Sequence, residues 1–350
     1  MLPPLYEDHP IAAMTTLGIG GTARHFSSPS STQELAALHQ WARARTLPTF
    51  VLGGGSNLLV DDHGFDGVLI QLSSRDCRVI DEQGDELRLR VDAGMPWDEL
   101  VAFCVAQGLR GVECMSGIPG TVGGAAVQNI GAYGQEVCDV IETVEVFDGV
   151  SQRSYSNDQC SFAYRHSRFK ARSEQGTITA VTLRLQRRAS ARVAYAELIA
   201  ALGEQEAELL AIREAVLAVR RRKSMLVDPS DPNTRSAGSF FVNPTITRQQ
   251  HASIESLSGK ALSAHGKGPM VKVSAAWLIE QAGFPRGYRS GQVGLSPAHA
   301  LAIINLGSAR ATEVLCFARS IRDAVFESFQ VELRPEPLWL GYRGLAPLPL

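Results

Sequence analysis

Two apolar periods run along the chain and predict a mixture of strands and helices. Short apolar or alternating runs, typical of buried or half-buried strands, occupy residues 48–52, 58–60, 67–72, 87–91, 140–147 and 177–185. Apolar residues at helical spacing predict helices over residues 31–45, 96–108, 204–222, 274–281 and 311–329. The tail at 331–340 again has the pattern of a strand.

Signals at the helix ends support these ranges. Ser31 and Glu34 form an S-x-x-E capping box, and Leu35, Leu38 and Trp41 follow on one helical face. Pro96 and Gly108 stand at the start and the end of the second helix, where each residue is favoured. In the helix at 204–222 the predicted inward side chains are Leu209, Leu210, Ile212, Val216 and Val219.

The length and composition limit the classes of protein to consider. With 350 residues, the chain is long enough for two or three domains at roughly 100–200 residues each. A proline-broken loop at 228–235 is a candidate boundary. Charged residues make up 20% and the net charge is −2, which argues against nucleic-acid partners and polybasic membrane binding.

The cysteines and histidines suggest neither disulfides nor a metal site. No two of the six cysteines have CxxC spacing, and the eight histidines show no metal-ligand spacing. Residues 1–10 lack the apolar core of a signal peptide. We therefore expect a cytoplasmic, soluble protein with reduced thiols and no metal.

An uncharged, glycine-rich segment at 116–134 is the most informative motif. It contains Gly117, Gly120, Gly123, Gly124, Gly131 and Gly134, and no charged side chain occurs between Cys114 and Gln135. Because glycine costs backbone entropy, this density needs a reason, and a backbone that approaches a phosphate with its N–H groups is one. A buried glycine-rich turn is the alternative.

A second glycine motif, Gly53-Gly-Gly-Ser-Asn57, follows the predicted strand at 48–52. It is not a Walker loop, because no Gly-Lys-Ser/Thr follows. It is not a dinucleotide fingerprint either, because Leu58 stands at the third glycine position. The turn fits a diphosphate, and a plain hairpin is the alternative. Residues 17–23 match G-x-G-x-x-A, but no βαβ pattern surrounds them, so a Rossmann site ranks last.

Three polar residues are candidates for catalysis, each with a plainer alternative. Arg165 lies in an aromatic and basic loop, where an arginine fork can bind a carboxylate or simply face solvent. Ser239 lies between a glycine and two phenylalanines and is not part of a G-x-S-x-G elbow. Its hydroxyl could donate a proton, or the residue could simply belong to a turn. Glu336 lies between Pro335 and Pro337, which fix the backbone around its carboxyl. This suits a positioned acid, but it also suits a plain edge strand.

In this order along the chain, the motifs resemble the UDP-N-acetylenolpyruvoylglucosamine reductase (MurB) family of peptidoglycan synthesis. The matching segments are 16–23, 52–57, 116–134, 164–170, 236–244, 290–294 and 335–336. The resemblance implies an α+β fold: a two-subdomain FAD-binding fold of the vanillyl-alcohol-oxidase (PCMH) type and a C-terminal substrate-binding domain. The implied ranges are 1–72 and 73–225 for the FAD-binding subdomains and 226–330 for the UDP-sugar domain, with the tail 331–350 packing back on the first.

The resemblance also implies the chemistry. NADPH would reduce a non-covalently bound FAD, which would pass hydride to the enolpyruvyl ether of UDP-N-acetylglucosamine enolpyruvate, giving UDP-N-acetylmuramate. Ser239 would protonate the neighbouring carbon, while Arg165 and Glu336 would stabilise the charge that develops on the substrate carboxylate. The sequence departs from the commoner family pattern at Pro337, where an aliphatic residue is usual.

Binding residues are carried over from the matching motifs. The implied FAD-binding residues are Gly53, Gly54, Gly55, Ser56, Asn57, Ser116, Gly117, Pro119, Gly120, Gly123, Gly124, Asn129, Gly131, Ala132 and Tyr133. The implied substrate-binding residues are Tyr195, Lys223, Asn243 and Gln292, with Tyr195 on a loop that closes over substrate. We expect a monomer whose partners are this substrate and NADPH, without nucleic acid or membrane.

Two further hypotheses stay open at this point. One is an oxidase of the same fold that uses oxygen, although Gly53–Asn57 contains no Cys or His for a covalent flavin link. The other is a nucleotide-sugar-binding protein without catalysis, which the three candidate catalytic residues argue against.

Overall fold

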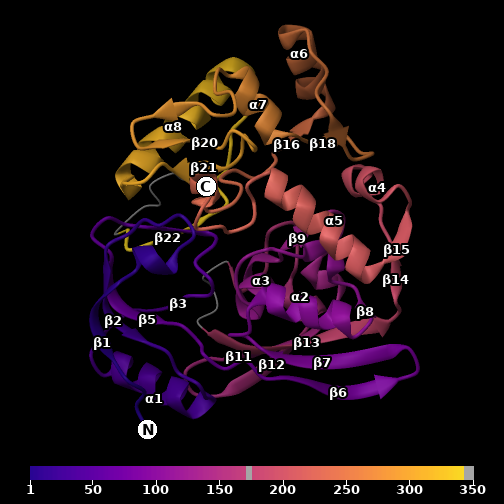
Figure 1. Cartoon of the computed structure of the whole chain (residues 1–350). Helices are drawn as coiled ribbons and strands as arrows, with labels where there is room; N and C mark the ends of the chain where they lie inside the picture. Colours follow the sequence, from indigo (N-terminus) through magenta and orange to yellow (C-terminus); the bar gives the residue numbers. More distant parts are fainter. Residues whose placement is uncertain (171–175, 343–350) are drawn as a thin grey trace. The chain divides into compact units, whose positions relative to one another are not determined.

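The computed structural model describes residues 1–170 and 176–342, drawn in Figure 1. The chain divides into two compact units, each built from separate stretches of sequence. Unit 1 comprises Met1–His9, Ala23–Gly54 and Asp66–Arg222. Unit 2 comprises Pro10–Thr22, Gly55–Phe65 and the chain from Lys223 onward.

Unit 1 contains most of the strands. Its α-helices are α1 (Thr32–Arg43), α2 (Trp97–Ala106), α3 (Val122–Gln128), α4 (Ala196–Leu202) and α5 (Leu209–Arg222). Its strands are β1 (Tyr6–Pro10), β2 (Thr22–Ser27), β3 (Thr49–Val51), β5 (Phe65–Ile70), β6 (Cys77–Gln83), β7 (Glu86–Asp92), β8 (Leu109–Arg110), β9 (Gly131–Ala132), β10 (Gln135–Glu136), β11 (Ile141–Phe147), β12 (Gln152–Ser156), β13 (Thr177–Arg187), β14 (Ser190–Arg192) and β15 (Glu206–Glu208).

A small sheet with the order β1-β2-β5-β3 packs against α1. The predicted cap is present, since the Ser31 side chain accepts a hydrogen bond from the Glu34 N–H. Its reciprocal half differs, because the Glu34 carboxylate accepts from the N–H and hydroxyl of Ser30. Leu35 and Leu38 are buried against the sheet as expected, whereas Trp41 is only half-buried.

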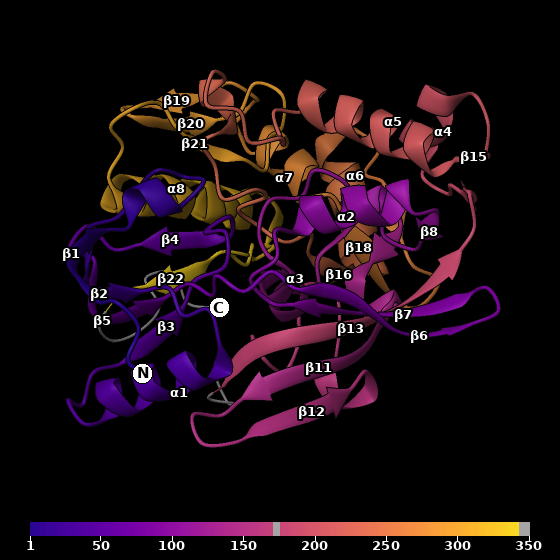
Figure 2. The same cartoon turned by 60° about the horizontal axis from the view of Figure 1, so that its bottom comes forward.

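A larger, mainly antiparallel sheet with the order β12-β11-β13-β7-β6 forms the centre of unit 1. β13 is its middle strand, and its first seven residues are buried. Figure 2 shows α2 and α3 on one face of this sheet. The core between them contains Val91, Leu100 and Val181, and Val216 of α5 joins the same cluster.

The helix predicted at 204–222 begins later, at Leu209. Its expected start is a strand instead, because Glu206–Glu208 pairs antiparallel with Ser190–Arg192. The prediction that Leu210 faces inward is wrong, since 57% of the residue is exposed. Leu209, Ile212, Val216 and Val219 are buried as expected.

Unit 2 contains three α-helices and several short strands in its described part. The helices are α6 (Arg248–Ser258), α7 (Ala275–Gln281) and α8 (Ala311–Phe329). The strands are β4 (Leu58–Val60), β16 (Thr245–Thr247), β17 (Ala264–His265), β18 (Met270–Val273), β19 (Arg289–Ser290), β20 (Val293–Leu295), β21 (Ile303–Asn305) and β22 (Leu338–Leu340). Phe240, Phe241, Leu278, Val314 and Ile321 lie in its core.

Two distant stretches of sequence join inside unit 2. Of the tail predicted as a strand over 331–340, only Leu338–Leu340 forms one, β22, which pairs parallel with β4 and places Leu338 opposite Leu58. Asp62, two residues beyond β4, accepts hydrogen bonds from the N–H groups of Ala311 and Thr312 at the start of α8. Residues 343–350 of the predicted tail lie outside the described residues.

Two features bear on the remaining sequence hypotheses. The segment 17–23 continues into strand β2 and not into a helix, so it lacks the βαβ setting of a Rossmann site. Among the described residues, no helix is both long and apolar enough to cross a membrane.

Candidate active site

The two glycine motifs touch each other through their backbones in unit 1. A Cβ built on Gly54 would lie 2.6 Å from the Cα of Gly120, and one on Gly53 would lie 2.9 Å from Thr121 Oγ1. Within the described part of the chain, the amide N–H groups of Gly53, Gly54 and Gly120 donate no hydrogen bond. Bare backbone with available N–H groups suits a diphosphate, so these residues fit the cofactor that the motifs suggest.

Part of the glycine-rich segment is helical, which sequence reasoning missed. Thr121 caps α3, because its side chain accepts a hydrogen bond from the Gly124 N–H. Gly123 packs tightly on Ala93, since an added Cβ would lie 2.8 Å from the Ala93 Cβ. At this glycine close packing explains the missing side chain, but in a helix and not in the buried turn named as the alternative.

The segment ends in a tight hairpin. β9 and β10 pair Ala132 with Gln135 around Tyr133 and Gly134, whose φ angles are +50° and +89°. Two successive positive φ values define a type I′ turn. The ring of Tyr133 makes an edge contact with Tyr195, at 5.3 Å between centroids. A predicted FAD-binding residue and a predicted substrate-binding residue are therefore neighbours.

The side chain of Asn129 is used within the protein. Its Nδ2 donates to Glu136 Oε2 and to the Ala163 carbonyl, both at 2.9 Å, and its Oδ1 accepts from the Cys138 N–H at 3.2 Å. The residue is fully buried in a left-handed conformation at the end of α3. These contacts fix the bend between α3 and the hairpin.

Arg165 is directed at the glycine-rich segment, so the plainer reading as a solvent-facing arginine does not hold. Its Nη2 donates to the Gly131 carbonyl at 2.6 Å, and its Nη1 donates to the Asn129 carbonyl at 3.4 Å. Ala163 and His166 close a tight turn around it through paired backbone hydrogen bonds, and Arg165 has a φ of +55°.

Ser239 and Glu336 lie on neighbouring segments of unit 2. The Glu336 N–H donates to the Phe240 carbonyl at 2.9 Å, and Phe241 bridges Pro335 in antiparallel fashion. On the other side, Asn57 Nδ2 donates to the Glu336 carbonyl at 3.3 Å. The structure thus brings together two of the three predicted catalytic residues and one predicted FAD-binding residue.

His299 is a neighbour of Ser239 that sequence reasoning missed. Its Nε2 lies 3.5 Å from Ser239 Oγ. The turn that carries His299 is fastened to the serine segment, because the Phe240 N–H donates to the Leu301 carbonyl at 2.7 Å. A search for metal-ligand spacing passes over this histidine, since its contact lies 60 residues away in sequence.

The remaining predicted substrate residues are spread over unit 2. Asn243 Oδ1 accepts from the Ala275 N–H at 3.0 Å, at the start of α7. Gln292 is exposed in the turn between β19 and β20, and half-buried Lys223 directly follows α5. The structure does not bring Gln292 into contact with Ser239 in the way that it does His299.

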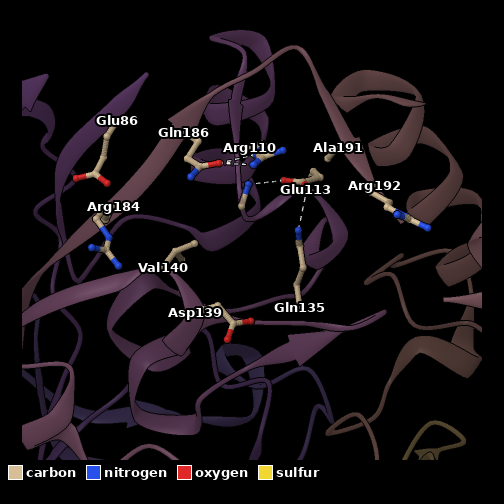
Figure 3. A pocket seen from close by; sticks show the side chains of 11 residues that line it. Glu86, Arg110, Glu113, Gln135, Asp139, Val140, Arg184, Gln186, Ala191 and Arg192 are labelled. Carbon is tan, nitrogen blue, oxygen red and sulfur yellow. Dashed lines mark hydrogen bonds between the residues drawn. The ribbon is translucent and has the colours of Figure 1, made fainter. Parts of the chain in front are cut away.

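A polar cavity of about 480 Å³ lies elsewhere in unit 1 and is shown in Figure 3. It is lined by Glu86, Arg110, Gly111, Glu113, Gln135, Asp139, Val140, Arg184, Gln186, Ala191 and Arg192, and none of these is a predicted site residue. Its inner groups bind each other: Arg110 donates to Gln186, and buried Glu113 accepts from Gln135. Several polar groups of the cavity are thus already bound to each other, and no predicted site residue lines it.

Comparisons with known proteins identify the two parts of the chain. Residues 23–151 match the FAD binding domain family, and residues 229–340 match the C-terminal domain of UDP-N-acetylenolpyruvoylglucosamine reductase. Together with the two glycine motifs that meet at Gly54 and Gly120, these matches define an FAD-binding oxidoreductase.

The relatives make the assignment more specific. The chain is 43% identical to UDP-N-acetylenolpyruvoylglucosamine reductase of Thermobifida fusca over 95% of this chain and 97% of the relative. It is 40% identical to that of Streptomyces coelicolor over 97% and 92%. A crystal structure of MurB from Thermus caldophilus matches with a TM-score of 0.67 and 29% identity over 97% of this chain and 99% of that one.

The chain belongs to the UDP-N-acetylenolpyruvoylglucosamine reductase family, the FAD-dependent reductases of peptidoglycan synthesis. The resemblance inferred from the motifs is confirmed, as are the α+β FAD-binding fold and the FAD cofactor. The roles of individual residues and the three domain ranges remain predictions.

Proposed function

We propose that this chain reduces UDP-N-acetylglucosamine enolpyruvate to UDP-N-acetylmuramate, with NADPH as the hydride donor and FAD bound non-covalently. The observation that carries the residue assignment is the pairing of the Ser239 segment with the Glu336 segment in unit 2. This pairing fixes a hydroxyl and a carboxyl, 97 residues apart in sequence, on adjacent backbone.

The proton step is assigned to Ser239. When bound, FAD supplies the hydride that adds to the terminal carbon of the enolpyruvyl group. The Ser239 hydroxyl gives its proton to the adjacent carbon, next to the carboxylate. Without this proton, that carbon would carry the negative charge left by hydride addition. Its half-buried place beside Phe240 limits competing proton donation by water.

The substrate carboxylate is assigned to Arg165 and Glu336. A guanidinium stabilises negative charge that grows during the reaction. The family pattern assigns Glu336 to the same carboxylate. The backbone of each residue is fixed, by the 163–166 turn for Arg165 and by the Phe240 contact for Glu336. Fixed donors stabilise charge without reorganising as it develops.

The binding roles follow from the same family pattern. We assign the cofactor diphosphate to the Gly53–Asn57 and Ser116–Tyr133 motifs, and the substrate to Tyr195, Lys223, Asn243 and Gln292. The meeting of Gly54 with Gly120 supports the first assignment. For Asn129 the support is indirect, because its side chain shapes the segment instead of facing a ligand.

The decisive experiment measures NADPH oxidation by the purified protein with and without UDP-N-acetylglucosamine enolpyruvate. We expect oxidation that depends on the substrate and is faster with NADPH than with NADH. Rapid, substrate-independent reoxidation by air would instead favour an oxidase. A colourless protein that FAD cannot reconstitute would refute both the reductase and the oxidase hypotheses.

Two further properties belong to the same proposal. Acid precipitation should release all flavin into the supernatant, because the flavin is not covalently bound. We also expect a cytoplasmic monomer that binds neither nucleic acid nor membrane, consistent with the net charge of −2. Light scattering after gel filtration measures the oligomeric state directly.

A further inference from the structure

The glycine-rich segment carries no charge of its own, yet a charged side chain from outside holds its start. Asp98 lies in the first turn of α2. Its Oδ1 accepts a hydrogen bond from the Gly117 N–H at 2.6 Å. Gly117 has a φ of +72°, in the left-handed region that glycine adopts readily. Because glycine is free to adopt other conformations as well, a contact from outside the segment helps to hold it there.

Asp98 is itself fixed by Arg213 of α5. Arg213 Nη1 donates to Asp98 Oδ1 at 2.6 Å and Nη2 donates to Oδ2 at 2.8 Å, which makes a two-point ion pair. The Arg213 side chain is only 14% exposed. Burial raises the pKa of Asp98, but the hydrogen bonds from Arg213 and Gly117 outweigh burial and hold the pKa below its ordinary value.

The same end of α2 supports the next residues of the segment. The Trp97 N–H donates to the Gly120 carbonyl at 3.0 Å, and the Val122 N–H donates to the Met95 carbonyl at 2.9 Å. Gly120 is the residue whose Cα meets Gly54. A shift at Gly117 would therefore reach the point where the two glycine motifs touch.

Side-chain hydrogen bonds also connect the residues that flank the two ends of the segment. Gln135 Nε2 donates to Glu113 Oε1 at 2.8 Å, as Figure 3 shows, and Gln135 Oε1 accepts from the Cys114 N–H at 2.8 Å. The other Glu113 oxygen accepts from the Gly111 N–H at 2.6 Å. Both ends of the segment are therefore closed, and between them the Asp98 carboxylate holds the backbone at Gly117.

We propose that Asp98 is a positioning residue for FAD, which orders the glycine-rich segment through Gly117 while Arg213 neutralises its charge. The neutralisation is needed because an unpaired carboxylate behind a diphosphate site would repel the diphosphate. This inference rests on the proposed placement of the cofactor diphosphate at Gly54 and Gly120.

The test measures FAD affinity of the apoprotein by flavin fluorescence. Asp98→Ala should weaken binding at least about tenfold, since it removes a hydrogen bond made by a charged group. Asp98→Asn keeps an acceptor for Gly117 and should weaken binding less. Arg213→Met leaves the carboxylate unpaired and should weaken binding more than Asp98→Asn does. Adding Asp98→Asn to Arg213→Met should restore part of the affinity.

A matched ion pair in the same unit is the control. Arg90 and Glu145 form a two-point pair at 2.7 and 2.8 Å across the large sheet. Glu145→Ala should lower the melting temperature of the apoprotein and leave FAD affinity unchanged. At saturating FAD, the reaction rate of Asp98→Ala should return close to wild type, because Asp98 acts through the cofactor site and touches no substrate.

The outcomes separate this inference from the proposed function. If folded Asp98→Ala binds FAD as wild type does, or if Arg213→Met and Asp98→Asn have additive effects, the inference is overturned. Gly54→Val tests the placement itself, since its side chain would meet Gly120. Should folded Gly54→Val also bind FAD normally, the proposed placement fails with it.

Discussion

Ser239 and His299 show what a single residue gains from the fold. Alone in the sequence, Ser239 is a serine beside two phenylalanines, and only its family pattern marks it. The structure adds an imidazole 3.5 Å from its hydroxyl. Motifs could predict Arg165, Ser239 and Glu336, because their neighbours in sequence carry the pattern. They could not predict His299, whose contact lies 60 residues away, or Asp98, whose contacts with Gly117 and Arg213 lie 19 and 115 residues away.

At this scale we predict that Ser239→Ala separates the two half-reactions. Reduction of the flavin by NADPH should keep its wild-type rate, while overall turnover should fall by about 10²–10⁴, the usual contribution of a positioned acid. Stopped-flow absorbance of the flavin measures the first rate, and steady-state NADPH oxidation measures the second. Turnover at the wild-type rate would mean that another group gives the proton.

A companion prediction concerns His299. His299→Gln retains a side chain that can hydrogen-bond to the serine hydroxyl. We expect a smaller fall in turnover than for Ser239→Ala, measured by steady-state NADPH oxidation. A fall as large as that of Ser239→Ala would contradict this prediction.

Helices and strands followed their apolar periods except where a tertiary contact replaced the local preference. α8 occupies the predicted range, because nineteen residues of continuous helical spacing leave no ambiguity. α5 begins five residues late, since Glu206–Glu208 finds a strand partner in β14. α3 was not predicted, because Gly123 and Gly124 disfavour a helix, and its Thr121 cap and the packing of Gly123 on Ala93 appear only in the fold.

At the scale of elements, Gln135→Ala should loosen the β9–β10 hairpin. The mutation leaves Glu113, which is 2% exposed, without its side-chain donor, and removes the acceptor of the Cys114 N–H. We expect the free energy of unfolding in urea to fall by about 1–3 kcal/mol. The control is Gln83→Ala, since Gln83 is exposed and its amide donates to the nearby Asp81. A similar loss of stability there would contradict the prediction.

The whole molecule interleaves its two units along the chain. A linear scan divides a sequence into consecutive ranges, and the ranges 1–72, 73–225 and 226–330 are of that kind. Contacts instead assign 10–22 and 55–65 to the unit that holds the C-terminal part. Segments distant in sequence join one unit through strand pairing and core packing. The apolar periodicity along the chain does not encode these contacts.

One prediction concerns the stability of unit 1 at alkaline pH. Burial raises the pKa of Cys77 and of Cys160 from 9.0 to about 11, and that of Cys114 to about 12. Above pH 9 the unfolded thiols lose protons that the folded thiols keep, so the folded state binds more protons and its stability falls as pH rises. From pH 8 to pH 10.5 we expect the melting temperature of unit 1 to fall by at least about 3 °C.

Differential scanning calorimetry measures this effect, and a Cys77→Ala/Cys160→Ala variant is the comparison. The variant should lose less stability over the same pH range, because two of the raised thiols are absent. Equal losses in both proteins would assign the alkaline sensitivity to other groups, among them Tyr133, whose pKa burial raises to about 12.

The parallel pairing of β22 with β4 has a consequence for biosynthesis. Leu58–Val60 leave the ribosome well before their partner Leu338–Leu340 has been synthesised. Until Leu340 has emerged, this apolar strand has an open edge. Unit 2 cannot complete its fold before then, so its β4 edge is the place where a nascent chain would need a chaperone.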